Sequence, residues 1–358
     1  MRITGRLAVL LLAAIPLPVI AAAPTDATVT RVAPDKVRIS WKDANGADVL
    51  MSDHADATAK ASTLVSPDDR DGAHEQTVRP GERAYFLLRD HKSGDAIRVA
   101  ERVLPLAQGS NFRDVGGYAA AGGKHVKWGM IFRSGATPLL SDADVQQVSG
   151  LHLANMVDLR SSEERQLAPS RIYGVPYNAI GYSMAQITNA MKATGTPANA
   201  MPTNGDALYR KMPDMLAPQM KLLFDRLLDR SGPLAYNCSA GQDRTGLATA
   251  LVLSALGVSR DVIKADYLLS TPNRHPEWEM PWFDPAAYPD NAAAQMFARP
   301  KDAPVRPANP LYMPDGTPFI TYALDQIDKD YGSVEGYLDK KLGVSAADIA
   351  TLRATYLE

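Results

Sequence analysis

The fold of most of the chain is decided by one stretch, which reads Asn237-Cys238-Ser239-Ala240-Gly241-Gln242-Asp243-Arg244-Thr245-Gly246. The residues that lead into it, Pro233–Asn237, are typical of a short strand. Those that follow, Thr245–Leu256, form an apolar segment that predicts a helix ended by Gly257. Strand, tight loop and helix thus follow in order, and such a loop at a helix N-terminus can bind an anion.

The spacing of Cys238 and Arg244, with five residues between them, fits the cleavage of phosphate esters. Backbone N–H groups of the loop would converge on one centre, where cationic and dipolar surroundings favour a thiolate. A thiolate is a competent nucleophile, and a guanidinium can bind two phosphoryl oxygens at once. The stretch therefore predicts Cys238 as nucleophile and a phosphate-binding set of Ser239, Ala240, Gly241, Gln242, Asp243 and Arg244. The alternative is a buried core cysteine beside a glycine turn, which leaves the rest of the string unexplained.

The composition excludes several classes of protein and of metal site. The 358 residues suffice for about two domains, and 46% hydrophobic with 22% charged residues is ordinary for a globular protein. A net charge of -2 provides no basic footprint for nucleic acid. The single cysteine excludes an intramolecular disulfide and a zinc site built on cysteine clusters, and the histidines form no HExxH pair. We therefore expect no metal, no cofactor and no nucleic-acid partner.

The first 22 residues are typical of a signal peptide. Arg2 and Arg6 supply the positive start, Leu7–Ile15 is an apolar run, and small residues follow, with cleavage favoured after Ala22. The alternative is a membrane anchor, but the run is shorter than the roughly 20 residues that a span requires. The sequence therefore predicts an exported protein, periplasmic or secreted, with no transmembrane segment after cleavage.

Residues 23–105 are expected to form a small all-β sandwich. Val37, Ile39 and Trp41 alternate with polar residues, which indicates a strand with one buried face. Turn-rich stretches such as Asp43–Gly46 separate this strand from further short ones. The region resembles a fibronectin type III domain, with Trp41 in its core. Nothing in the sequence indicates what this domain binds.

Residues 106–358 have a different pattern, in which strands alternate with helices. Ala154–Leu159 is typical of a buried strand, and Asp206–Arg230 has helical spacing interrupted by prolines. The alternation predicts an α/β domain with a central, mainly parallel sheet flanked by helices. Residues 272–314 are rich in proline and aromatic residues, as in a functional lid or an insertion.

At the Cys-x5-Arg loop the chain resembles the cysteine-dependent protein tyrosine phosphatases. It is most similar to a bacterial branch of secreted atypical tyrosine and phosphoinositide phosphatases, whose loop reads His-Cys-x-Ala-Gly-Lys-Asp-Arg-Thr-Gly. Further motifs of that branch are Asn111–Tyr118, Ile131–Gly135 and Asp158–Arg160. The resemblance covers residues 106–358 and implies a metal-independent enzyme that acts on phosphotyrosine proteins or peptides.

The resemblance also implies roles for residues of the loop. A general acid must protonate the leaving oxygen, and Asp243 is the candidate, with Asp114 and Asp158 as alternatives. Thr245 would assist the departure of the thiolate in the second step. Arg133 is expected to be a structural pairing partner, as is Arg113 of the preceding motif.

Two positions depart from the pattern of the branch. Asn237 stands where a histidine is usual, and Gln242 stands where a lysine would add a cation beside the substrate. A neutral residue at position 242 favours phosphotyrosine over multiply charged phosphoinositides. Two alternatives to a tyrosine phosphatase remain: an inositol-phosphate or phosphoinositide phosphatase, and a non-catalytic phosphate-binding or adhesion protein.

Overall fold

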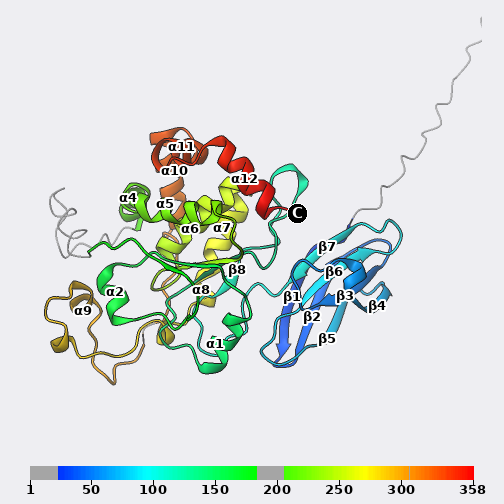
Figure 1. The fold of residues 1–358 in the computed structure, drawn as a ribbon, viewed down its shortest axis with the longest axis horizontal. Coiled ribbons are helices and arrows are strands. Elements are labelled where there is room, and N and C mark those ends of the chain that lie inside the picture. Colours follow the sequence, from blue (N-terminus) through cyan, green and yellow to red (C-terminus); the bar gives the residue numbers. More distant parts are fainter. Residues whose placement is uncertain (1–22, 184–204, 306) are drawn as a thin grey trace, which may run out of the picture.

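The computed structural model of the protein describes residues 23–183, 205–305 and 307–358 (Figure 1). The predicted signal peptide, residues 1–22, lies outside the described residues. Two bodies lie next to each other, one made of strands β1–β7 and a larger one that contains the helices labelled with α (Figure 1). None of the helices in the described ranges combines the length and the apolar character that a membrane span needs.

The N-terminal body contains two antiparallel sheets. One has the strand order β1 (Thr25–Ala33), β2 (Lys36–Lys42), β5 (Ala73–Thr77). The other has the order β4 (Thr63–Asp69), β3 (Ala47–Ser52), β6 (Tyr85–Asp90), β7 (Ala96–Ala100). A short 3-10 helix, η1 (Ala59–Ala61), precedes β4.

The two sheets share one apolar core. The predicted alternation of β2 is confirmed, because Val37, Ile39 and Trp41 are buried and pack with β6 residues such as Phe86. Trp128 comes from the larger body but belongs to the same cluster, and its indole N–H donates to a backbone carbonyl of β7 at 3.0 Å. The two bodies are therefore joined through a common core and not only through a linker.

The larger body is built on a five-stranded sheet with the order β11 (Tyr177–Asn178), β10 (Asn155–Asp158), β12 (Leu234–Asn237), β9 (Ile131–Ser134), β8 (Arg113–Asp114). The pairs β11–β10, β10–β12 and β12–β9 are parallel, and only β8 runs antiparallel to its neighbour. The expected mainly parallel sheet is thus confirmed.

Helices cover both faces of this sheet. On one face α5 (Ala217–Leu228) and α6 (Asp243–Ala255) pack on Leu234 and Tyr236 of the central strand. On the other face α1 (Asp142–Ser149) packs on Phe132 and Met156. The remaining helices are α2 (Ser162–Leu167), α4 (Gly205–Met215), α7 (Arg260–Leu268), α8 (Ser270–Asn273), α9 (Ala292–Phe297), α10 (Phe319–Tyr331), α11 (Val334–Leu342) and α12 (Ala346–Tyr356), with 3-10 turns at Ala121–Gly123, Pro276–Trp278 and Pro285–Ala287.

One expected helix break differs from the structure. Pro213 lies inside α4 near its end, whereas the helix is interrupted at Leu216 and Pro218 sits in the first turn of α5. A proline in the first helical turn removes an N–H that has no intrahelical partner, so it is tolerated there. The prolines therefore mark the join between two helices without ending the first one early.

The parallel register brings three strand ends to one edge. Asp158, Asn237 and Ser134 are aligned neighbours at the ends of β10, β12 and β9. The loops that follow these strands start from the same edge, which is where open parallel sheets bind ligands. The Cys238 loop is the middle one of the three.

Candidate active site

The loop from Cys238 to Gln242 connects β12 to α6, as the sequence predicts, and Cys238 is 1% exposed. Gly241 has φ +66°, and a Cβ atom there would lie 2.6 Å from the backbone nitrogen of Gly135, so only glycine fits. The Gly241 carbonyl accepts hydrogen bonds from Asn111 and Arg133, each at 2.8 Å. The loop is thus held by the two neighbouring motifs that the sequence analysis singled out.

Arg244 lies in the first turn of α6 and forms a bidentate pair with Glu164 of α2, at 2.6 and 2.7 Å. Its Nη1 also donates to the Tyr182 hydroxyl at 2.7 Å. These partners use three of the five N–H groups of the guanidinium, and the side chain is 20% exposed. Two N–H groups therefore remain for a ligand.

Glu164 connects the two ends of the loop. Its carboxylate accepts from the Ser239 hydroxyl at 2.7 Å as well as from Arg244. Burial alone would raise the pKa of Glu164, but the charge and hydrogen bonds of Arg244 outweigh burial and hold that pKa well below its usual range. The pKa of Arg244 is correspondingly held well above its ordinary value, because the charge of Glu164 outweighs the effect of burial. The pair is therefore ionised at neutral pH.

Asp243 begins α6 and is half-buried beside the loop. Its Oδ1 accepts a hydrogen bond from the Tyr209 hydroxyl at 2.5 Å, and this hydroxyl lies 2.5 Å from that of Tyr267. Burial, together with the charge of Asp243, raises the pKa of Tyr209, so the phenol stays protonated and can donate. One carboxylate oxygen is thus fixed by a tyrosine, while no hydrogen bond within the described residues occupies the other.

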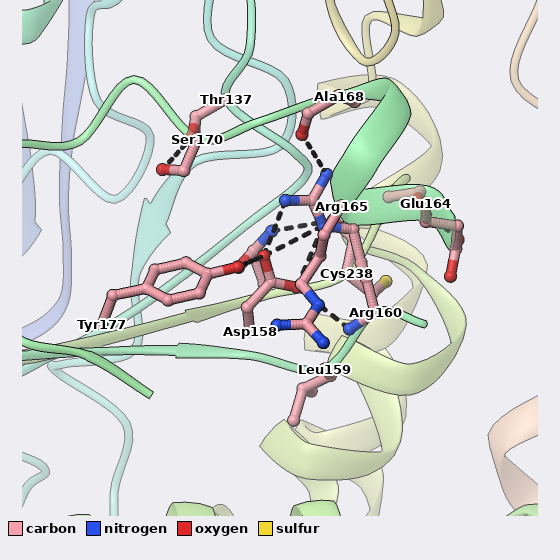
Figure 2. A network of polar contacts seen from close by, with 12 residues as sticks. Thr137, Asp158, Leu159, Arg160, Glu164, Arg165, Ala168, Ser170, Tyr177 and Cys238 are labelled. Atoms are coloured by element: carbon pink, nitrogen blue, oxygen red, sulfur yellow. Dashed lines mark hydrogen bonds and ion pairs between the residues drawn. The ribbon is translucent and has the colours of Figure 1, made fainter. Parts of the chain in front are cut away.

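The two alternative general acids, Asp158 and Asp114, are bound to structural partners. Asp158 is fully buried, forms a bidentate pair with Arg160 and accepts from the Tyr177 hydroxyl at 2.6 Å (Figure 2). Asp114 is also fully buried, pairs with Arg83 at 2.7 Å and accepts from two backbone N–H groups. Carboxylates whose oxygens are saturated by protein donors have a structural role, so these two alternatives are not supported.

Arg113 and Arg133 lie beneath the loop and are fully buried. Both contact the carboxylate of Asp266 on α7, Arg133 at 2.5 Å and Arg113 at 3.4 Å. Burial would raise the pKa of Asp266, but the charges of the two arginines outweigh it and hold the pKa well below its usual range. The expectation that both arginines are structural pairing partners is confirmed.

Several buried polar atoms next to the loop have no hydrogen-bond partner among the described residues. They include the Ser134 hydroxyl, the Thr245 hydroxyl, the Asn237 side-chain oxygen and the Gln242 side-chain nitrogen. Buried polar groups without a partner are uncommon and often mark a functional site. The strand ends and the loop near Cys238 thus carry donors and acceptors that the described part of the chain leaves unused.

Gln242 replaces a lysine that would add a cation to the loop, but the site has a second cation nevertheless. Its side chain is buried, and its Oε1 accepts a hydrogen bond from Arg274 at 2.6 Å. Arg274 in turn forms a bidentate pair with Glu279. The sequence analysis considered only cations within the loop, whereas this one comes from the proline-rich segment, 32 positions further along the chain.

Sequence reasoning assigned no role to three charged residues of this site, although Glu163-Glu164 belongs to the motifs that carry the family resemblance. Glu164 has a local signal, since Ser161 and Glu164 form a capping box at the start of α2, but the signal indicates only a helix start. Arg274 and Glu279 lie in an irregular segment and have no local signal. In the described ranges, no cluster of histidine, cysteine, aspartate and glutamate side chains is arranged as a metal site.

Comparison with known proteins gives a consistent match. The model of the tyrosine phosphatase family matches residues 104–358. A Cupriavidus necator protein, whose name assigns it provisionally to the tyrosine-protein phosphatases, is 32% identical over 254 residues, covering 69% of this chain and 86% of its own. The triple specificity protein phosphatase PtpB of Mycobacterium tuberculosis is 30% identical over 294 residues, covering 72% of this chain and 100% of its own.

Solved structures give weaker likenesses. TpbA of P. aeruginosa is 15% identical and covers 49% of this chain and 84% of its own, with a TM-score of 0.23. An Fn3-like protein from Clostridium thermocellum is 16% identical and covers 23% of this chain and 91% of its own, with a TM-score of 0.20. Scores this low add nothing to the family match.

Proposed function

Because the chain belongs to the tyrosine phosphatase family and is a protein-tyrosine phosphatase, we propose that it works through a covalent thiophosphate on Cys238. One observation carries this proposal. The loop after β12 and the first turn of α6 bring together Cys238, Asp243 and Arg244, to which we assign the roles of nucleophile, acid and phosphate ligand. Nucleophile, acid and electrostatic stabiliser within one rigid turn are what phosphoryl transfer requires.

In the first step the Cys238 thiolate attacks phosphorus and the S–P bond forms. The bond from phosphorus to the tyrosine oxygen breaks, and its electron pair stays on that oxygen. Asp243 gives its proton to the oxygen, so tyrosine leaves as a neutral phenol. The free N–H groups of Arg244 and the backbone N–H groups of the loop stabilise the equatorial oxygens of the transferred group.

In the second step water attacks phosphorus of the thiophosphate. Asp243, now a carboxylate, takes a proton from the water, and the S–P bond breaks with its electron pair returning to sulfur. Inorganic phosphate leaves, and the enzyme is restored with its thiolate and its protonated acid. We assign Thr245 to donate to the departing thiolate, since its buried hydroxyl has no other partner within the described ranges.

Hydrolysis of p-nitrophenyl phosphate and of a phosphotyrosine peptide in the presence of a metal chelator tests this proposal. Wild type should turn over both substrates, and Cys238→Ser should lose at least about a thousandfold in kcat because serine is not ionised there. Thermal unfolding of the variant checks that the fold is retained. Activity within tenfold of wild type in a folded Cys238→Ser protein would overturn the covalent mechanism, and no turnover by wild type would favour the phosphate-binding or adhesion alternative.

We further propose that the protein is exported and that its N-terminal body is a fibronectin type III-like sandwich. Support for export comes from Arg2, Arg6 and the apolar run that precedes Ala22. Support for the sandwich comes from seven strands in sheets of three and four, with Trp41 buried between them. The mass of the mature protein recovered from the periplasm or the medium tests export. A mature chain that still begins at Met1 would contradict it.

A further inference from the structure

A segment of the proline-rich region is hydrogen-bonded to Ser110 and Asn111, which lie next to the catalytic loop. The backbone N–H of Asn111 donates to the Asn273 carbonyl at 2.8 Å, and the His275 N–H donates to the Ser110 hydroxyl at 2.9 Å. The same hydroxyl donates to the Glu279 carboxylate at 2.8 Å. Residues 273–279 are therefore held by Ser110 and by Asn111, whose side chain also supports Gly241.

This segment presents Arg274 at the loop. Its Nε and Nη2 donate to Glu279, each at 2.8 Å, and its Nη1 donates to the Gln242 side chain at 2.6 Å. Three of the five N–H groups are thus used, and one remains on each terminal nitrogen. The side chain is 21% exposed, which is nearly the same as the 20% of Arg244.

The two arginine–glutamate pairs at the loop have the same construction. Glu164 accepts from a serine hydroxyl and from Arg244, and Glu279 accepts from a serine hydroxyl and from Arg274. Both glutamates are nearly buried, while both arginines keep free N–H groups. Burial lowers the pKa of Arg274, but the hydrogen bond and charge of Glu279 outweigh it, with further contributions from Asp243 and Cys238, so Arg274 stays a cation.

We propose that Arg274 forms a second anion-binding subsite beside the phosphate loop, which selects substrates with another acidic group on the same small ring as the scissile phosphate. The proposal rests on the function proposed above, because it assumes that a phosphoryl group occupies the Cys238 loop. It deepens that function by naming a residue that sets the substrate class.

The position of Arg274 favours a compact substrate. Arg274 donates a hydrogen bond to Gln242, a residue of the loop itself, so its guanidinium lies directly beside the phosphate loop. An acidic side chain of a peptide is separated from the phosphate by the whole tyrosine side chain. A second phosphate on a neighbouring ring carbon is much closer, and a guanidinium fork matches it.

Gln242 acquires a different role in this account. A lysine at that position would carry the cation itself, whereas glutamine supplies an acceptor that orients an arginine from elsewhere in the chain. The neutral residue in the loop is therefore no argument against a multiply charged substrate.

The test compares kcat/KM for an inositol monophosphate and for the matching vicinal inositol bisphosphate. For Arg274→Gln we expect the bisphosphate to lose about ten- to a hundredfold more than the monophosphate, as for a lost hydrogen bond to a charged group. Arg274→Lys should recover part of the loss, since it keeps the charge without the fork. A parallel pair of phosphotyrosine peptides, with Asp or Asn beside the phosphotyrosine, should show no difference between its two members in wild type or Arg274→Gln.

Two further variants serve as controls for the effect of Arg274→Gln. Arg274→Gln removes the main partner of Glu279, so the double variant Arg274→Gln/Glu279→Gln keeps the site free of an unpaired charge and should show the same preference change. Arg260→Gln also removes one positive charge, but from an ion pair that lies beyond the C-terminal end of α6. It should leave the ratio of kcat/KM for the bisphosphate to that for the monophosphate unchanged.

The outcomes separate the two proposals. Equal losses for mono- and bisphosphate would overturn the Arg274 subsite while hydrolysis of p-nitrophenyl phosphate still supports the cysteine mechanism. A change confined to the Asp and Asn peptides would also overturn it, since the second acid would then come from a peptide side chain. Failure of wild type on every phosphomonoester would instead overturn the proposed function.

Discussion

Two groups of arginines lie at the phosphate loop, and they differ in their exposure and in how their counter-charge is shared. Arg113 and Arg133 lie beneath it with no exposed surface and contact the buried Asp266. Arg244 and Arg274 lie at its rim, each about one-fifth exposed and paired with its own glutamate. The charge is the same in all four, so access to solvent distinguishes the arginines that we propose to bind substrate from those that support the loop.

Arg113 and Arg133 share the single carboxylate of Asp266, so a change at this cluster should cost much of the free energy of unfolding. Asp266 compensates two fully buried guanidinium groups, and burial together with the charge of Arg133 lowers the pKa of Arg113 to about 10. At the rim each arginine has a full carboxylate and access to solvent. We therefore expect changes beneath the loop to act mainly on stability and changes at the rim mainly on turnover.

The largest effect is expected from Asp266→Asn. This change leaves two buried arginines without a counter-charge, and loss of one partner in a buried ion pair costs about 3–5 kcal/mol. Urea unfolding should show this fall in the free energy of unfolding. Asp328→Asn is the matched control, because its pair with Arg260 is exposed and should contribute less than about 1 kcal/mol. Equal losses of unfolding free energy for Asp266→Asn and Asp328→Asn would contradict the distinction between the buried and the exposed ion pair.

A smaller effect, on turnover, is expected from Arg244→Lys. Lysine keeps the charge opposite Glu164 but loses the fork that holds phosphoryl oxygens, so kcat/KM should fall by about 10²–10³-fold. The urea midpoint should change little. If Arg244→Lys loses stability and keeps its activity, Arg244 supports the loop in the way that Arg113 and Arg133 do.

The smallest effect concerns the pH dependence of stability. The pKa values of Asp266 and Glu164 are held below their ordinary range, so their stabilisation is present above the unfolded pKa of about 4 and is lost as the pH falls further. Wild type should therefore lose stability in acid more steeply than Asp266→Asn, by up to about 1.4 kcal/mol per pH unit. Urea unfolding between about pH 3 and pH 7 measures both slopes, and parallel acid limbs would contradict the prediction.

The part of the site that the sequence predicts is local in the chain. Cys238, Asp243 and Arg244 belong to one strand–loop–helix unit, and the spacing within a loop fixes which side chains and N–H groups converge. The mainly parallel sheet is predictable for a similar reason, since the alternation of strands and helices leaves few other arrangements.

The part that could not be predicted depends on long-range contacts. Arg274 reaches the loop because Ser110 and Asn111 hold its neighbours, and no local pattern encodes that path. Trp128 belongs to the larger body by its place in the chain, yet it packs into the core of the N-terminal body. Glu164 is recognisable as a capping residue, but its pairing with Arg244 exists only after α2 and α6 have been brought together.

Direct trapping of the intermediate tests the central claim, that Cys238 carries the phosphoryl group. Wild type mixed with p-nitrophenyl phosphate and quenched in denaturant within the first turnover should gain the mass of one phosphoryl group, located on the peptide that contains Cys238. Cys238→Ser treated in the same way should gain none. A phosphoryl group on any other residue, or a burst of p-nitrophenol from wild type without a phosphorylated enzyme, would contradict the account.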